Sequence, residues 1–195
     1  MLDWDALNDF RRKSLNPEHP AQRGTAQNPD VFFQAKEASN KAYDAIPEVV
    51  EEYMNKVNEK IGSDYKLFNY YGAEDADEVI IAMGSVCDTI SETVDYLNAN
   101  GRKVGLVKVR PFSVKHLVAA IPSTVKKICV LDRTKEPGSI GEPLYLDVVA
   151  ALRDTEFANV PVYTGRYGLG SKDTTPAQII AVFKNTEKKR FTIGI

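Results

Sequence analysis

The sequence has little cysteine and histidine, and it lacks any long apolar run. Its two cysteines, Cys87 and Cys129, do not have the spacing of metal ligands and cannot form a disulfide framework, so a reducing compartment fits best. Two isolated histidines, His19 and His116, form neither a metal site nor a catalytic triad. No signal peptide or membrane-spanning segment is recognisable. We therefore expect a soluble, cytoplasmic protein with no membrane partner.

An excess of charge of one sign is also missing. The 195 residues include 25 basic and 27 acidic side chains, which gives a net charge of -2. The chain therefore has no excess of positive charge that would attract nucleic acid, and no nucleic-acid partner is expected. A composition of 43% hydrophobic and 27% charged residues can bury a sizeable core. The length fits one domain, with or without an appendage.

Residues 1–78 have the pattern of a helical linking arm. Apolar residues at helical spacing predict a short helix over 3–14 and a long amphipathic helix over 30–61. Asp30 is expected to cap the long helix, Gly62 to end it, and Pro47 to kink or split it. The segment between the two helices is rich in proline and is expected to be irregular. No strand is predicted in this part, and exposed apolar residues on the long helix would mark a surface that other domains cover.

Residues 79–195 alternate between strands and helices. Strands are predicted over 79–83, 104–109, 128–131, 160–163 and 191–195. Single helices separate them, with predicted caps at Ser85 (paired with Asp88), Ser113 and Thr175, and with Pro143 in a first turn. Strands joined in this way run parallel with right-handed crossovers. The prediction is a three-layer α/β/α domain with a mainly parallel, doubly wound sheet of about five strands. The apolar run at the end suggests a chain cut from something longer.

Three glycine-bearing loops are expected to meet beyond the carboxyl ends of the strands, where open parallel sheets bind ligands. They span 84–88, 132–141 and 165–172. None of them matches a known phosphate-binding signature. The loops either need glycine geometry for their turns and contact neighbouring domains, or hold a small anion. The candidate residues for an anion site are Ser85, Arg133, Lys135, Arg166 and Lys172.

Other polar residues do not complete an active site. Cys87 in the first turn of a helix is either a reactive thiolate or a buried, inert core residue, and the second interpretation is the simpler one. Asp132, Glu136 and Asp147 are either acid/base carboxylates or groups that cap and pair, as carboxylates at strand ends and on helix faces usually do. The sequence therefore predicts no catalytic residue, no cofactor-binding residue with a known motif, and no metal ligand.

Several segments resemble the middle of the pyruvate:ferredoxin (flavodoxin) oxidoreductase family. Among them are VLDRTKEPGSIGEPLYLDV and GRYGLGSKD, and the full set covers residues 15–34, 83–97, 130–148, 165–173 and 191–195. The resemblance implies a linking arm followed by the family's second domain, which is similar to the C-terminal domain of transketolase. It divides the chain into an arm (1–78) and an α/β domain (79–195).

The resemblance also implies what the parent enzyme does. Such enzymes convert pyruvate and CoA to acetyl-CoA and CO2, using thiamine diphosphate, magnesium and iron–sulfur clusters, and reduce ferredoxin or flavodoxin. The sites for these groups lie in other domains, so this fragment would hold no cofactor and would contact the rest of its polypeptide and a second subunit of a homodimer. An anion-binding module for a CoA phosphate and a subunit of a different thiamine enzyme remain as alternatives. The chain departs from the family at Val109-Arg110-Pro111, where a few residues are absent, through a shorter loop or a gap in the sequence.

Overall fold

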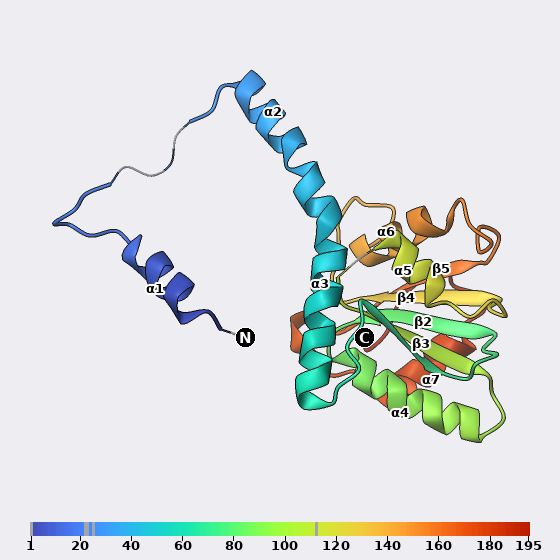
Figure 1. The fold of residues 1–195 in the computed structure, drawn as a ribbon. Coiled ribbons are helices and arrows are strands. Elements are labelled where there is room, and N and C mark those ends of the chain that lie inside the picture. Colours follow the sequence, from blue (N-terminus) through green and yellow to red (C-terminus); the bar gives the residue numbers. More distant parts are fainter. Residues whose placement is uncertain (1, 22–23, 25, 112) are drawn as a thin grey trace. The chain divides into compact units, whose positions relative to one another are not determined.

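The structure is a computed structural model that describes residues 2–21, 24, 26–111 and 113–195 (Figure 1). The chain divides into two compact units, one up to Asp44 and one from Ala45 onward. The first unit contains α1 (Trp4–Arg12), α2 (Pro29–Ala38) and the start of α3 (Asn40–Ile61). None of the described residues of α1 and α2 is buried. The large apolar side chains of both helices, such as Phe10 and Phe33, are therefore exposed.

The predicted long helix is two helices, and the break lies at Ser39 instead of Pro47. The Ser39 hydroxyl donates a hydrogen bond to the carbonyl oxygen of Lys36, which offers the backbone an alternative to continuing the helix. Pro47 lies inside α3 without ending it. The prediction for Asp30 was wrong, because Asn28 occupies the capping position and Pro29 the first turn. Gly62 follows α3 with a φ of 68°, as predicted for a helix end.

The second unit is built on a six-stranded sheet. Its strands are β1 (Phe68–Gly72), β2 (Glu78–Met83), β3 (Val104–Val109), β4 (Lys127–Asp132), β5 (Val162–Arg166) and β6 (Arg190–Thr192). They lie in the order β1-β3-β2-β4-β5-β6, with β1 antiparallel to β3 and all other pairs parallel. The predicted class, a mainly parallel doubly wound α/β/α sheet, is confirmed.

The strand β1 corrects the expectation that residues 1–78 contain no strand. Its sequence, FNYYG, lacks the continuous apolar run of the interior strands, and only Phe68 is buried. As an edge strand it needs to pair on one side only, so its pattern is weak. The sheet consequently has six strands instead of about five. The boundary after residue 78 stays a prediction.

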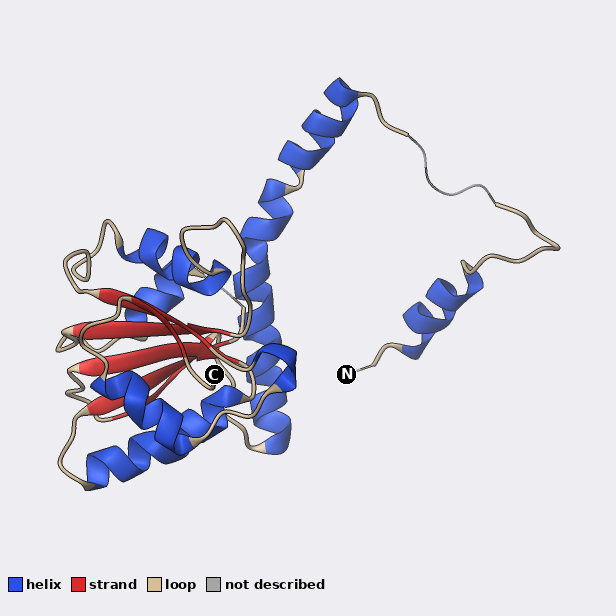
Figure 2. Cartoon of the chain, turned by 180° about the vertical axis from the view of Figure 1, so that it is seen from behind, coloured by secondary structure: helices blue, strands red, loops and turns tan. Residues whose placement is uncertain are grey.

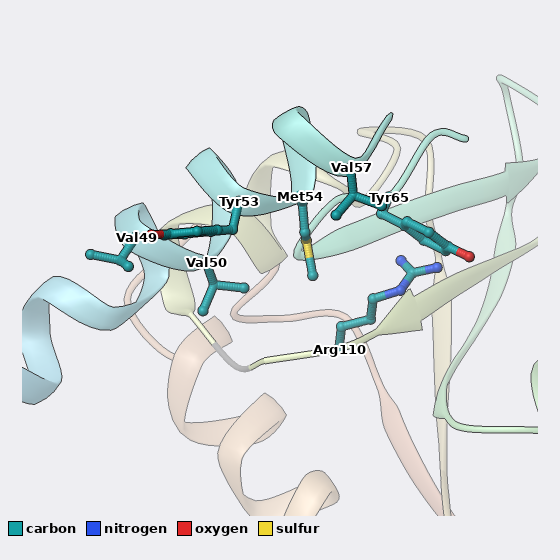
Figure 3. A pocket seen from close by; sticks show the side chains of 7 residues that line it. All are labelled: Val49, Val50, Tyr53, Met54, Val57, Tyr65 and Arg110. Carbon is teal, nitrogen blue, oxygen red and sulfur yellow. The ribbon is translucent and has the colours of Figure 1, made fainter. Parts of the chain in front are cut away.

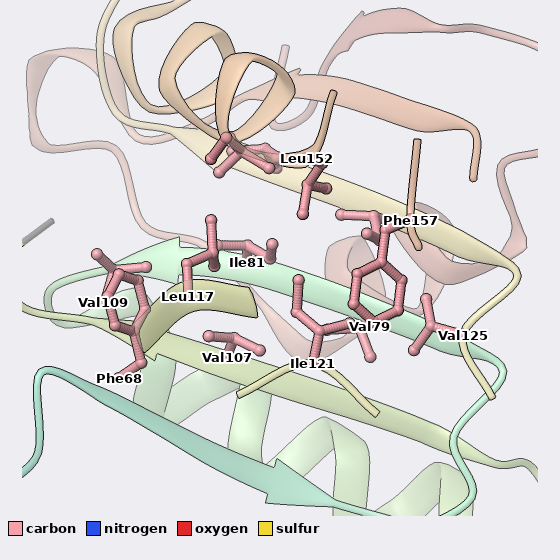
Figure 4. Packing of buried hydrophobic residues seen from close by; sticks show 14 of the residues in the cluster. Phe68, Val79, Ile81, Val107, Val109, Leu117, Ile121, Val125, Leu152 and Phe157 are labelled. Atoms are coloured by element: carbon pink, nitrogen blue, oxygen red, sulfur yellow. The ribbon is translucent and has the colours of Figure 1, made fainter. Parts of the chain in front are cut away.

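Two layers of helices cover the sheet (Figure 1, Figure 2). α4 (Val86–Ala99) and α7 (Pro176–Lys184) pack on one face, with a core that includes Ile80, Leu106 and Ile179. α5 (Val114–Ala119) and α6 (Pro143–Leu152) cover the other face, where the core includes Val79, Ile81 and Leu117 (Figure 4). These apolar residues alternate along each strand, so neighbouring side chains enter opposite cores. The sheet is thereby buried on both faces, as parallel sheets require.

The starts of these helices agree with the sequence in part. Thr175 caps α7 in a capping box with Gln178, and Pro143 opens α6, as predicted. The prediction for Ser85 was wrong, because its backbone is already helical and its side chain makes no capping hydrogen bond. Ser113 stands at the capping position of α5, but its hydroxyl lies 2.9 Å from Nδ1 of His116 and does not cap the helix.

Candidate functional site

The candidate site lies beyond the carboxyl ends of β2 and β4. From β2 the chain crosses to β3 on one side, and from β4 it crosses to β5 on the other. Because the two connections diverge, a crevice opens between the strand ends, and open α/β sheets bind ligands at such switch points. Two adjoining pockets, of about 320 and 290 Å³, occupy this position. The loops that follow β2, β4 and β5 form them, as the sequence predicted.

Three of the five predicted anion-site residues meet at these pockets. Ser85 and Arg133 line both, and Lys172 lines the larger one. The side chains of Thr89 and Thr174 and the buried Tyr167 also line the larger pocket, although the sequence analysis did not single them out. Thr89 follows Ser85 by one helical turn, and this spacing places both on the same face of α4. The sequence could have indicated Thr89 through this spacing.

Arg133 is held in place by the loop opposite. Its Nε donates to the carbonyl oxygen of Gly168 at 3.0 Å, and its Nη2 donates to Oγ of Ser171 at 3.2 Å. Gly168 and Ser171 both have a φ of 62°, a left-handed conformation that is uncommon for serine. Tyr167 joins this loop to β2, because its hydroxyl donates to the carbonyl oxygen of Met83 at 3.3 Å. The pocket wall is therefore fixed by contacts between all three loops.

The two other predicted residues lie outside the pockets. Lys135 is exposed and lines neither. Arg166 instead forms an ion pair with Glu142, in which Nη1 lies 2.9 Å from Oε1, and Arg190 approaches the same oxygen at 2.9 Å. Glu142 also accepts a hydrogen bond from the backbone N–H of Glu136. Burial acts to raise the pKa of Glu142, but these partners outweigh it and hold the pKa below its ordinary value.

The buried carboxylate at the end of β4 has a structural role. Asp132 accepts hydrogen bonds from the backbone N–H groups of Leu144 and Tyr145, at 3.0 and 3.2 Å, and so caps α6 from a neighbouring strand. Burial raises its pKa above the ordinary value, against the effect of these two hydrogen bonds. For Asp132 the geometry therefore matches the interpretation that the carboxylate caps a helix.

Both cysteines are expected to be unreactive in the folded chain. Burial raises the pKa of Cys87 to about 11 and that of Cys129 to about 12, so both remain neutral thiols at pH 7. We expect a thiol reagent to modify neither residue in the native chain at neutral pH, and both after unfolding in denaturant. Mass spectrometry of the labelled chain would measure this. Rapid native labelling of Cys87 would support a reactive thiolate at the start of α4.

The described residues offer no cluster of ligands for the magnesium that accompanies thiamine diphosphate. Within the described ranges no group of three or more His, Cys, Asp or Glu side chains could hold a metal ion. Of the two carboxylates that line the pockets, Asp132 in the smaller one caps α6, and Asp173 stands in the larger one with Arg133 and Lys172. No step through such a cofactor is derived for this part of the chain. In the same described part, no helix is long and apolar enough to cross a membrane.

Comparison with known proteins identifies two family models. Residues 76–179 match pyruvate:ferredoxin oxidoreductase core domain II, and residues 3–55 match the thiamine-diphosphate-binding model of pyruvate flavodoxin/ferredoxin oxidoreductases. The second match covers the first unit from residue 3 and continues along α3 to residue 55.

Curated relatives match the whole chain. The pyruvate-flavodoxin oxidoreductase of Enterobacter agglomerans is 56% identical over 202 positions, and the pyruvate:ferredoxin oxidoreductase of Moorella thermoacetica is 54% identical over 202 positions. Each alignment covers 100% of this chain but 17% of the relative. The alignments are longer than the 195-residue chain, so the relatives have residues in this region that the chain lacks. Phe112, at the predicted departure, lies outside the described residues.

A solved structure has the same fold. It is a 2-oxoglutarate:ferredoxin oxidoreductase from Magnetococcus marinus with 2-oxoglutarate, coenzyme A and succinyl-CoA bound. The match has a TM-score of 0.51 at 19% identity and covers 83% of this chain and 24% of that one. At this identity the likeness concerns the fold alone. Because one family model matches more than half of the chain and the relatives match all of it, the chain belongs to the pyruvate:ferredoxin oxidoreductase family and contains its core domain II.

Proposed function

We propose that this chain is a segment of a longer pyruvate:ferredoxin or pyruvate:flavodoxin oxidoreductase, in which it is a non-catalytic domain for contacts between domains and subunits. The observation that carries the proposal is 56% identity over the whole chain to an oxidoreductase of which it spans 17%. The parent reaction would convert pyruvate, CoA and an oxidised acceptor to acetyl-CoA, CO2 and a reduced acceptor. Thiamine diphosphate, magnesium and iron–sulfur clusters would be bound elsewhere in a cytoplasmic homodimer that reduces ferredoxin or flavodoxin.

Polar residues at the switch point and beside it support a structural role. Asp132 caps a helix, Glu142 pairs with Arg166, and Arg133 fixes the loop after β5. A general base or nucleophile needs a free polar atom and a positioned partner that takes or gives its proton. The contacts of Asp132 and Glu142 leave them committed to the fold. Their geometry agrees with a domain that positions its neighbours and does no chemistry itself.

The purified chain is expected to form no acetyl-CoA. With pyruvate, CoA, thiamine diphosphate, magnesium and an electron-accepting dye present, we expect no dye reduction above a control without protein, because the described part offers no cluster of metal ligands. The full-length enzyme under the same conditions is the positive control. Acetyl-CoA formation that scales with the amount of the chain would contradict the proposal.

The native size of the protein tests whether it is a segment. An antibody against the chain is expected to detect, in source cells, a polypeptide several-fold larger than 21.7 kDa. A single band near 21.7 kDa would instead mean a free-standing protein. In that case the family would remain, but the assignment to a large oxidoreductase would be withdrawn.

A second function is favoured by the arrangement of Ser85, Arg133 and Lys172 around one pocket, namely binding of an anion such as a CoA phosphate. Two cations beside hydroxyl groups are suited to phosphate oxygens. Titration calorimetry of the chain with CoA and with inorganic phosphate would test it. This function predicts heat that Arg133→Ala and Lys172→Ala remove and that Lys135→Ala leaves unchanged. The structural role alone predicts no heat from either ligand.

A further inference from the structure

The part of α3 that belongs to the second unit has two apolar faces. Val50 and Met54 pack against the core that also contains Leu117. Ile46, Val49 and Tyr53 are 42, 50 and 53% exposed, although they are large apolar side chains on the same helix. A surface helix normally presents one apolar stripe to its own core and polar residues outward. Packing within this fold therefore does not explain why the outward-facing residues of α3 are apolar.

Val49 and Tyr53 belong to one wall of an apolar groove of about 490 Å³ (Figure 3). Seven residues line it: Val49, Val50, Tyr53, Met54, Val57, Tyr65 and Arg110. Arg110 is the one charged residue among them, and its guanidinium is already engaged. It donates to the carbonyl oxygen of Lys66 at 3.0 Å and to the side chain of Asn69, and it lies 5.0 Å from the ring centroid of Tyr65. The groove therefore offers apolar contact.

The spacing of the apolar residues indicates the shape of an occupant. Val49, Tyr53 and Val57 line the groove and follow one another at intervals of four residues along α3. This is the spacing by which one helix packs along another. Helices bind in apolar grooves through side chains at the same intervals. The occupant that fits is consequently an amphipathic helix that presents aliphatic or aromatic side chains.

We propose that this groove is the docking surface for an apolar helix face from the part of the family's polypeptide that lies outside this chain. The relatives match the chain over its full length, yet 83% of their own length lies beyond the match. Contiguous apolar surface on a folded unit marks an interaction site. The polypeptide that accompanies this segment in the family is the partner present at equal amount and high local concentration. The inference rests on the proposed function, because it takes the chain as part of that longer protein.

Cysteine labelling can test the groove, because the native cysteines are buried. Tyr53→Cys places a reporter in the groove, and Asn55→Cys places a control on the same helix, about 200° around from Tyr53. Each substitution is made in the 195-residue chain and in the longer polypeptide. We expect Tyr53→Cys to react about ten-fold or more slowly in the longer polypeptide than in the chain, and Asn55→Cys to react at similar rates in both. Val49→Cys, also in the groove and exposed, provides a second reporter if Tyr53→Cys does not fold.

Three labelling results would overturn the proposal. Equal labelling of Tyr53→Cys in both proteins means that the longer polypeptide leaves the groove open. Protection in the isolated chain that disappears on dilution means that a second copy is the occupant. Protection at every dilution means that the chain covers the groove itself. If the longer polypeptide oxidises pyruvate but the reporter cysteine reacts as fast as in the chain, the docking proposal fails and the proposed function stands. A longer polypeptide that protects the reporter but lacks pyruvate activity refutes the proposed function alone.

Discussion

Replacing Glu142 by alanine is expected to lower the free energy of unfolding by about 2–4 kcal/mol. The carboxylate is fully buried and pairs with Arg166 and Arg190, whose side chains are 20 and 38% exposed. Removing it leaves two guanidinium groups without their anion and frees the N–H of Glu136. The partial exposure of both arginines lets water replace some of the lost contacts, so the loss is smaller than for a fully enclosed pair. Denaturant titration of the chain would measure it.

The dependence on pH separates the charge of Glu142 from its packing. The folded pKa is lowered from 4.5, the value for an unfolded chain, so its stabilising effect is fully present above about pH 4.5 and is lost as the pH falls through the folded pKa. Glu142→Gln keeps the size of the side chain and removes its charge. The difference in stability between the native chain and this variant should therefore be largest at pH 7 and shrink at acid pH. A difference that does not change with pH would refute the electrostatic explanation.

Glu142 also shows where sequence reasoning reached its limit. The topology of an open parallel sheet predicted which loops meet at the strand ends, and three of five candidate residues do meet there. Sequence position alone did not distinguish Arg133 from Arg166, because each lies at or just after the end of a strand. The direction of each side chain depends on a partner distant in the sequence, which for Arg166 is Glu142. Such partners are known only after the chain has folded.

The strands also differ in how clearly the sequence predicts them. β2, β3 and β4 are buried on both faces, so each is a short continuous apolar run that the sequence displays directly. β1 lies at the edge, and its tyrosines are partly exposed, so its sequence has no comparable signal. What keeps β1 in place is tertiary pairing with β3, in which Gly72 lies opposite Gly105. That close approach leads to the last expected result.

Gly72→Ala is expected to destabilise the chain by about 2–4 kcal/mol, through backbone strain and a steric clash together. The φ of Gly72 is 134°, where only glycine is relaxed, and an added Cβ would lie 2.5 Å from the carbonyl oxygen of Val104. The matched control is Gly101→Ala, which has a positive φ of 81° but nothing within 4 Å of an added Cβ. The control should therefore be destabilised only by its unfavourable backbone conformation, by about 1 kcal/mol. Denaturant titration of both variants would measure the difference.

Val104 cannot easily move away to relieve the clash. Its carbonyl oxygen accepts hydrogen bonds from the backbone N–H of Ala73 and from Nδ2 of Asn98, at 3.1 and 3.0 Å, and its own N–H donates to Oδ1 of Asn98. Displacing Val104 would break these contacts between β3 and the end of α4, so the less costly response is for β1 to separate from β3. Amide hydrogen exchange should then accelerate in β1 more than in β4. Equal stability of the two alanine variants would show that β1 bends away at no cost, and that the edge strand is held less firmly than its geometry indicates.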